Sequence, residues 1–200
     1  MSEFLLELFG TVHVLRLQSA DGTNRLTRQC VLSLTDEIRR LARQAVSPPA
    51  SMMTAGLVIA GNTRFFSAGA DLAEISALTG PSAYEFSKMG QALMAAIADF
   101  PAPLYAAVAG YCMGGGLDLA LACHHRIASP HAIFGHRGAA LGLITGWGGT
   151  QRLPRLIGKG PALEMFVAAE KISAKHALQI GLIEAIADDP IAESVRRLAS

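Results

Sequence analysis

Three consecutive glycines near the middle of the chain mark the first place where chemistry could occur. The run AAVAG at residues 106–110 is typical of a buried strand, and the segment after Gly114, Gly115 and Gly116 is typical of a helix packed on all sides. Bare glycine backbone can approach a ligand closely, and the first N–H groups of a helix have no intrahelical partner. Such a turn favours a negatively charged oxygen, although a tight turn without any ligand is an open alternative.

A second turn of this kind lies earlier in the chain. The apolar run GLVIAG at residues 56–61 predicts a buried strand, and FFSAGAD at residues 65–71 leads through small residues into a short helix. Backbone N–H groups are therefore expected at the end of a second buried element. The two turns could each donate one N–H group to the same oxygen.

Three long motifs occur in order along the chain: FFSAGADLAEI, AGYCMGGGLDLALACHHRIAS and GLITGWGGTQRLPRLIG. Together they closely resemble the crotonase (enoyl-CoA hydratase/isomerase) superfamily, from about residue 10 to the C-terminus. The resemblance implies an acyl-coenzyme A thioester as substrate, with no tightly bound cofactor and no metal. It implies that the N–H groups of Ala70 and Gly115 form an oxyanion hole for the enolate, and that Ala68, Gly69 and Gly114 line the substrate site.

The carboxylates of this family are only partly present. Hydratases of the family carry two glutamates, whose positions are Asp118 and Gly138 here, and the dienoyl-CoA isomerase branch has an aspartate where this chain has Gly146. We therefore expect Asp118 to act as acid/base rather than as a helix cap, and hydration by the two-glutamate route is in doubt. His136 is the second catalytic candidate, since it lies two residues before Gly138 on a segment expected to be extended.

Three further residues are assigned to substrate binding, each with a structural alternative. Arg25 lies in the loop where relatives touch the nucleotide of coenzyme A, but it could equally be a solvated arginine. Asp71 is adjacent to Ala70 and could instead cap the short helix that follows. Trp147 could form a wall of the acyl pocket or belong to the core.

Two functions from different classes remain open at this point. The first is an enzyme of the enoyl-CoA hydratase/isomerase type, either a lyase or an isomerase, that works through an enolate. The second is an acyl-CoA-binding or assembly protein that keeps the site but has little or no catalytic activity. They share a binding site and differ in their carboxylates.

The elements that must position these groups alternate between strands and helices. We expect one domain over residues 1–200, with an α/β core to about residue 145 and a helical part from about 146 to 200. The resemblance implies a spiral of ββα units, followed by a C-terminal helical region that is short and apparently truncated. The expected strands are 4–9, 12–17, 57–60, 104–109, 126–129, 132–135 and 182–186, and the expected helices are 27–46, 72–78, 82–99, 115 onward, 146–157, 161–169, 173–180 and 191–198. Residues 20–27 are expected to form a polar loop, Pro48 and Pro49 to end the helix before them, and Gly80 and Pro81 to break the chain between two helices.

Composition indicates a globular protein rather than a disordered one. The 200 residues are 51% hydrophobic and 16% charged with a net charge of +1, so neither nucleic acid nor a membrane is expected as a partner. The three cysteines lack metal spacing and indicate reduced thiols, and the N-terminus does not resemble a signal peptide, so a cytoplasmic location is expected. A chain with this much apolar surface that ends before the family's usual covering helices is expected to expose hydrophobic patches, which predicts a homotrimer or hexamer.

Overall fold

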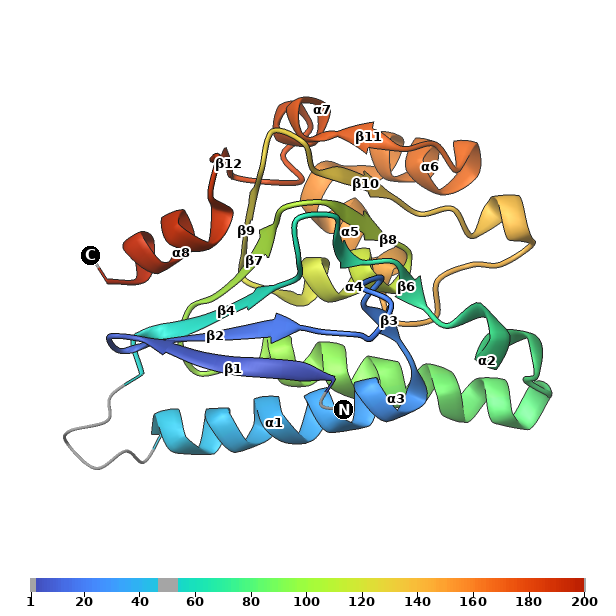
Figure 1. Ribbon diagram of the computed structural model, residues 1–200. Coiled ribbons are helices and arrows are strands. Elements are labelled where there is room, and N and C mark those ends of the chain that lie inside the picture. Colours follow the sequence, from blue (N-terminus) through green and yellow to red (C-terminus); the bar gives the residue numbers. More distant parts are fainter. Residues whose placement is uncertain (1–2, 47–53, 200) are drawn as a thin grey trace.

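The computed structural model describes residues 3–46 and 54–199, which wind into a stack of strand, strand and helix units (Figure 1). The strands are β1 (Phe4–Phe9), β2 (Val12–Leu17), β3 (Arg25–Leu26), β4 (Gly56–Ala60), β5 (Phe65–Ser67), β6 (Gly69–Ala70), β7 (Leu104–Val108), β8 (Tyr111–Met113), β9 (His125–Ala128), β10 (Ile133–Gly135), β11 (Ile172–Ser173) and β12 (Ala185–Ile186). The helices are α1 (Arg28–Val46), α2 (Leu72–Ser76), α3 (Gly80–Ala98), α4 (Gly115–Ala122), the 3₁₀ turn η1 (Ala139–Leu141), α5 (Gly149–Ile157), α6 (Lys159–Ala168), α7 (Ala174–Gln179) and α8 (Pro190–Leu198).

Successive units each add one strand to two different sheets. One sheet has the order β1-β2-β4-β7-β9-β12 and another has the order β11-β10-β8-β5, while β3 pairs with β6. The pairs β4 with β7 and β7 with β9 are parallel, as are β5 with β8 and β8 with β10. Each turn of the chain therefore stacks on the one before it, which confirms the α/β spiral of ββα units.

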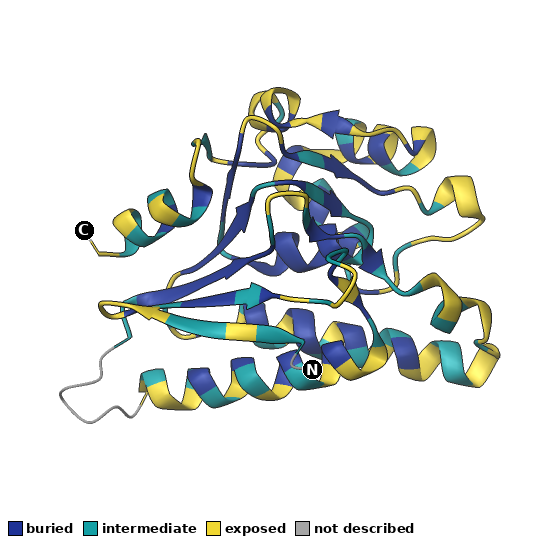
Figure 2. Cartoon of the chain, in the orientation of Figure 1, coloured by how far each residue is buried: buried dark blue, intermediate teal, exposed yellow. Residues whose placement is uncertain are grey.

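The central strands are buried because helices cover both faces of the large sheet. Every residue of β4 and of β7 is buried, as in the dark blue centre of Figure 2, and continuous apolar strands of this kind are typical of a sheet covered on both sides. On one face lies the main core, to which α1 contributes residues at helical spacing from Cys30 to Leu41. On the other face α8 packs its Ile191, Val195 and Leu198 against a smaller cluster.

Several boundaries differ from the sequence expectation. The loop expected over residues 20–27 contains β3, and the glycine turn is preceded by β8, because these short strands are defined by their partners β6 and β10 rather than by their own pattern. Gly80 and Pro81 do not break the chain but begin α3, since proline is tolerated in the first turn of a helix and Ser82 Oγ accepts from the N–H of Thr79 at 2.8 Å. The prolines expected to end α1 lie outside the described residues.

Candidate active site

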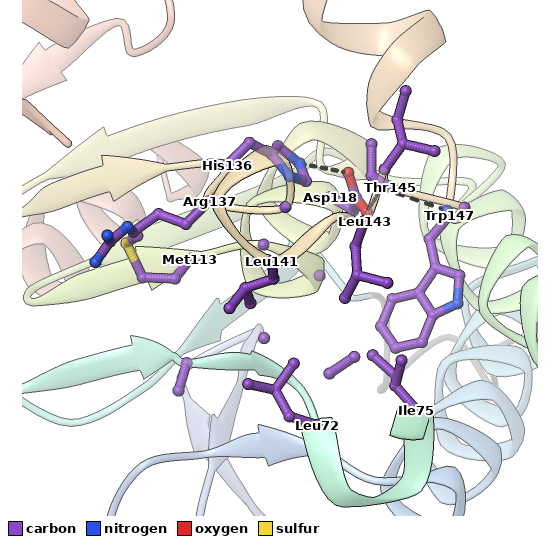
Figure 3. Close-up of a pocket in the computed structure, with 18 of the residues that line it drawn as sticks. Leu72, Ile75, Met113, Asp118, His136, Arg137, Leu141, Leu143, Thr145 and Trp147 are labelled. Atoms are coloured by element: carbon purple, nitrogen blue, oxygen red, sulfur yellow. Dashed lines mark hydrogen bonds and ion pairs between the residues drawn. The ribbon is translucent and has the colours of Figure 1, made fainter. Parts of the chain in front are cut away.

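A cavity of about 520 Å³ lies where the turns of the spiral meet. Its lining comes from β5, β6, α2 and α3 in the first half of the chain, and from β8, α4 and the segment between β10 and α5 in the second half. Figure 3 shows apolar side chains such as Leu72 and Ile75 across the cavity from Asp118 and His136. A pocket with apolar walls and a few convergent polar groups is the usual form of a small-molecule site.

The two small-residue turns meet at this cavity, as the sequence predicts. A Cβ added to Gly115 would lie 3.2 Å from the Ala70 nitrogen, and one added to Gly69 would lie 3.1 Å from the Gly115 nitrogen. Gly69 and Gly114 have positive φ angles of 95° and 51°, which side chains rarely adopt, so glycine is required to form both turns. The backbone of Ala70 and the start of α4 are thereby placed side by side, with no side chain between them.

Asp118 and His136 also lie together. His136 Nε2 is 3.0 Å from Asp118 Oδ1, and the two side chains are 4% and 2% exposed. The Asp118 carboxylate does not cap α4, because its oxygens face His136 and the hydroxyl of Thr145 rather than backbone N–H groups. The proximity of the two catalytic candidates thus follows from the fold, although Asp118 is on α4 and His136 follows β10.

The expectation of one extended segment through His136 and Gly138 is wrong. The strand β10 ends at Gly135, and Gly138 has helical angles of −56° and −45° because it leads into η1. Both residues nevertheless line the cavity. Gly138 therefore contributes backbone to the cavity, but no carboxylate, at the position of the second glutamate of the hydratases.

Trp147 is buried in the core and also lines the cavity. Its Nε1 donates to the carbonyl of Phe86 at 3.3 Å, and the two rings lie 5.3 Å apart. A Cβ on Gly90 would overlap the indole, so the indole packs directly against α3 backbone. The ring is consequently held in one position beside Gly115.

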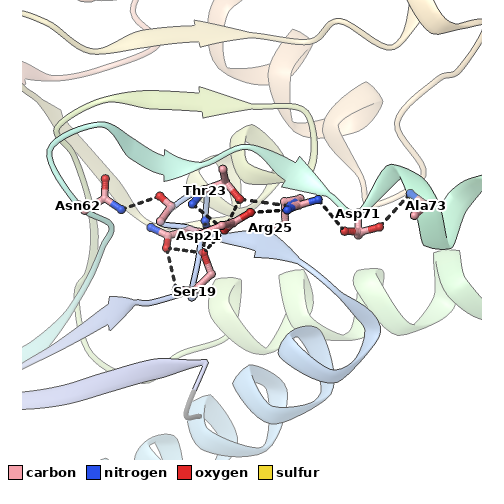
Figure 4. A network of polar contacts seen from close by, with 9 residues as sticks. Ser19, Asp21, Thr23, Arg25, Asn62, Asp71 and Ala73 are labelled. Atoms are coloured by element: carbon pink, nitrogen blue, oxygen red, sulfur yellow. Dashed lines mark hydrogen bonds and ion pairs between the residues drawn. The ribbon is translucent and has the colours of Figure 1, made fainter.

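Arg25 and Asp71 belong to a network next to the cavity rather than to its lining, which does include Ala68, Gly69 and Gly114 (Figure 4). Asp71 Oδ1 accepts from the N–H groups of Ala73 and Glu74 at 2.9 and 3.1 Å, which makes it the cap of α2. Asp71 Oδ2 pairs with Arg25 at 3.3 Å, and Arg25 also pairs with Asp21. Hydrogen bonds from Thr23, Arg25 and Ser19 hold the pKa of Asp21 well below its usual range.

Sequence reasoning missed four residues at the site. Thr145 and Gly149 contact the pair formed by Asp118 and His136, whereas the cations Arg137 and Lys171 line the cavity without an ion pair to any described residue. Lys171 Nζ instead lies 5.1 Å from the centre of the Tyr111 ring. A short motif signal existed for Thr145 and Gly149, since both lie in GLITGWGG, but none existed for the two cations.

The cysteines and other metal-ligating side chains form no second centre in the described part of the chain. All three cysteines are buried and free, and burial raises the pKa of Cys30 to about 12. No group of three His, Cys, Asp or Glu side chains in residues 3–46 and 54–199 is placed to hold a metal ion. In the same residues no helix is both long enough and apolar enough to cross a lipid bilayer.

Comparison with known proteins assigns the family. The enoyl-CoA hydratase/isomerase family matches residues 9–200. A probable enoyl-CoA hydratase from Bacillus subtilis (strain 168) is 45% identical over 147 residues, which cover 72% of this chain but only 57% of that protein. Among solved structures, Pseudomonas aeruginosa DspI has a TM-score of 0.90 at 33% identity and covers 100% of this chain and 80% of that one. An enoyl-CoA hydratase from Bacillus anthracis has a TM-score of 0.90 at 29% identity, with 99% and 76% covered. The chain therefore belongs to the enoyl-CoA hydratase/isomerase family, the crotonase superfamily.

Proposed function

We propose that this protein is an enzyme that binds an acyl-CoA thioester and acts on it through an enolate. The N–H groups of Ala70 and Gly115 form the oxyanion hole that holds the thioester oxygen. Asp118 and His136 are the candidate acid/base groups, and Trp147 and the residues of α2 enclose the acyl group. Coenzyme A enters as part of the substrate, and no tightly bound cofactor is required.

The observation that supports this proposal best is the contact between the two turns. Two backbone positions from different turns of the spiral border one cavity, and a Cβ added at Gly115 would lie 3.2 Å from the Ala70 nitrogen. Donors fixed in advance at the place where charge develops are the most effective form of transition-state stabilisation, and removal of one such donor costs about 10²- to 10³-fold in kcat.

The same geometry disfavours hydration by two carboxylates. Gly138 lines the cavity without a side chain, and Asp118 is already occupied by His136 and Thr145. Activation of a water molecule by this route requires two carboxylates. A proton shift within the acyl chain, or elimination and addition with one acid/base pair, requires fewer protein groups. We therefore favour isomerase-type chemistry over ordinary hydration.

A non-catalytic acyl-CoA-binding protein is the second candidate, and the absence of a side chain at Gly138 is the observation that favours it. The two candidates differ in one measurable property. An enzyme that forms the enolate exchanges the α-protons of butyryl-CoA in D₂O, which proton NMR detects. A binding protein quenches the fluorescence of Trp147, the single tryptophan of the chain, on addition of butyryl-CoA but exchanges no protons.

The decisive variant is Gly115→Pro, which deletes one proposed donor. Gly115 is the first residue of α4, where proline is tolerated, so the helix should still form. We expect exchange to fall by about 10²-fold or more and thioester binding to weaken. A Cβ at position 115 also lies 2.6 Å from the Trp147 ring, so Gly115→Ala, which keeps the N–H, is the control for crowding, and Gly160→Pro, in the first turn of α6 with open space around it, is the control for proline itself. The effect of the lost donor is the further fall in exchange from Gly115→Ala to Gly115→Pro. Unchanged exchange in a folded Gly115→Pro protein would place the site elsewhere.

Association of several chains is also proposed. Leu163 and Val167 lie one helical turn apart on α6 and are 64% and 69% exposed, so this helix presents an apolar face. A homotrimer or hexamer would bury this face. Light scattering at micromolar concentration is the test, and a monodisperse monomer would contradict the proposal.

A further inference from the structure

The carboxylate of Asp118 is the centre of a chain of hydrogen bonds. The backbone N–H of Trp147 donates to Thr145 Oγ1 at 3.5 Å, and the Thr145 hydroxyl donates to Asp118 Oδ2. The other carboxylate oxygen, Asp118 Oδ1, lies 3.0 Å from His136 Nε2. Both oxygens of this nearly inaccessible carboxylate are therefore engaged by the protein. Each oxygen can accept a second hydrogen bond, but only 2% of the side chain is exposed, so the carboxylate is poorly placed to take a proton from a substrate.

When the Asp118 carboxylate is ionised, this chain of bonds also determines which imidazole nitrogen carries the proton. An ionised carboxylate only accepts hydrogen bonds, so the ring nitrogen that faces Asp118 must be the protonated one. In a neutral imidazole the other nitrogen, Nδ1, is then the unprotonated one and can act as a base. Since His136 lines the cavity, that base belongs to a residue beside the two turns that border it.

The surroundings prevent the pair from rearranging. A Cβ at Gly149 would overlap Asp118 Oδ1 and would lie 3.1 Å from His136 Nε2, so the bare start of α5 closes one side of the contact. The ring of Phe166 on α6 lies 5.3 Å from the imidazole on another side. Three elements, α4, α5 and α6, thus hold the imidazole and the carboxylate together.

We infer that His136 is the group that exchanges a proton with the acyl thioester, and that Asp118 and Thr145 are positioning residues that hold its imidazole. This inference rests on the proposed function. In the step, the Cα–H bond of the acyl group breaks and its proton passes to His136 Nδ1. The electron pair of that bond forms the carbon–carbon double bond of the enolate, and the carbonyl π pair moves to the oxygen. Return of a proton from the imidazolium to carbon restores the thioester and the neutral ring.

The first test determines the tautomer of the imidazole directly. In protein labelled with ¹⁵N-histidine, NMR assigns the protonated nitrogen of each imidazole. We expect His136 to be protonated at Nε2 and unprotonated at Nδ1 when the ring is neutral. In Thr145→Val the Nε2 proton should exchange with solvent faster than in the parent, so that its NMR signal is weakened. A ring protonated at Nδ1 would overturn the inference.

The second test measures α-proton exchange of butyryl-CoA in D₂O together with binding by Trp147 fluorescence. His136→Gln is expected to lose about 10²- to 10⁴-fold in exchange rate with less than about 3-fold change in affinity. Thr145→Val should lower the rate by up to about 10²-fold through misplacement, and Thr145→Ser should restore most of it. Thr150→Val, at a half-buried position of α5 outside the cavity lining, is the matched control. Added imidazole should rescue His136→Ala, because the free base replaces the missing ring.

The outcomes separate this inference from the proposed function. If the parent exchanges protons and His136→Gln exchanges them within about 3-fold of the parent, His136 is not the base and only the inference fails. If the parent binds butyryl-CoA but exchanges no protons, the enzyme proposal and the inference fail together. Loss of exchange in Thr145→Val without rescue by serine would remove Thr145 from the positioning role.

Discussion

Replacement of Gly115 by alanine tests how tightly Trp147 packs against the backbone at the start of α4. The added methyl would lie 2.6 Å from Cζ3 and 2.9 Å from Cε3 of Trp147, whereas carbon atoms pack best at about 3.5–4.0 Å. The indole would therefore have to withdraw by about 1 Å. It has little room to do so, because its Nε1 is bonded to the Phe86 carbonyl and the backbone of Gly90 touches the ring.

Overpacking of this kind usually costs about 1–3 kcal/mol in the free energy of unfolding. For a chain of this size that corresponds to a fall in the thermal midpoint of about 2–4 °C per kcal/mol. A displacement of about 1 Å in the groups that position the substrate can also reduce the rate by about 10²-fold. We therefore expect Gly115→Ala to lower both the thermal midpoint and the α-proton exchange rate.

Circular dichroism melting and the exchange assay measure the two effects. Gly160→Ala, on a helix with open space around the glycine, is the control and should be neutral or slightly stabilising. Adding Trp147→Phe to Gly115→Ala should recover part of the lost stability, since the smaller ring leaves space for the methyl. The reasoning would be refuted if Gly115→Ala melted together with Gly160→Ala and exchanged protons at the parental rate.

Three other predictions concern residues outside the acid/base pair. The thiol of Cys30, whose pKa burial raises to about 12, should not react with Ellman's reagent at pH 8 until the protein unfolds; a fast reaction in native buffer would contradict the burial. Hydrogen bonds from Arg196 and Arg197 lower the pKa of Glu193 to about 2. The contribution of these hydrogen bonds to the free energy of unfolding should therefore be complete above about pH 4.5 and lost as the pH falls towards 2. Urea denaturation should accordingly give Glu193→Gln a lower free energy of unfolding than the parent at pH 7, and the same free energy near pH 2. Gly138→Glu should destabilise the loop without restoring hydration of crotonyl-CoA, because its Cβ would lie 2.6 Å from the Leu143 carbonyl oxygen; a stable variant that hydrates faster than the parent would show that the loop can adapt.

The parts of the fold that could be predicted from sequence are those with local causes. The helix α1 is visible because its buried residues recur at helical spacing, and the two turns are visible because only glycine tolerates their backbone. The strands β3, β8 and β11 have only two or three residues each, and their pairing depends on segments far along the chain. No local pattern distinguishes such strands from a loop.

The same distinction applies to the site. Asp118 and the backbone of Gly115 follow from one motif, whereas the contact of Asp118 with Thr145 requires the chain to pass through β9, β10 and η1 before it returns. The interpretation of Arg25 as a phosphate contact could not account for Asp71, which the pairing of β3 with β6 brings to it from far along the chain, and it overlooked Asp21, four residues away in the same loop. That interpretation stays a prediction, now with two carboxylates as competitors.

The winding of the spiral also fixes the order in which the site can form as the chain is synthesised. The turns at Ala70 and Gly115 can meet once α4 has emerged, but Asp118 acquires its partners only after His136 and Thr145 have been added, and Gly149 closes the contact last. The 27 positions from Asp118 to Thr145 take about 1–5 s at the usual elongation rates of about 5–20 residues per second. During that interval the Asp118 carboxylate lacks the Thr145 hydroxyl, so a nascent chain that stalls there leaves one carboxylate oxygen without its partner in an apolar pocket.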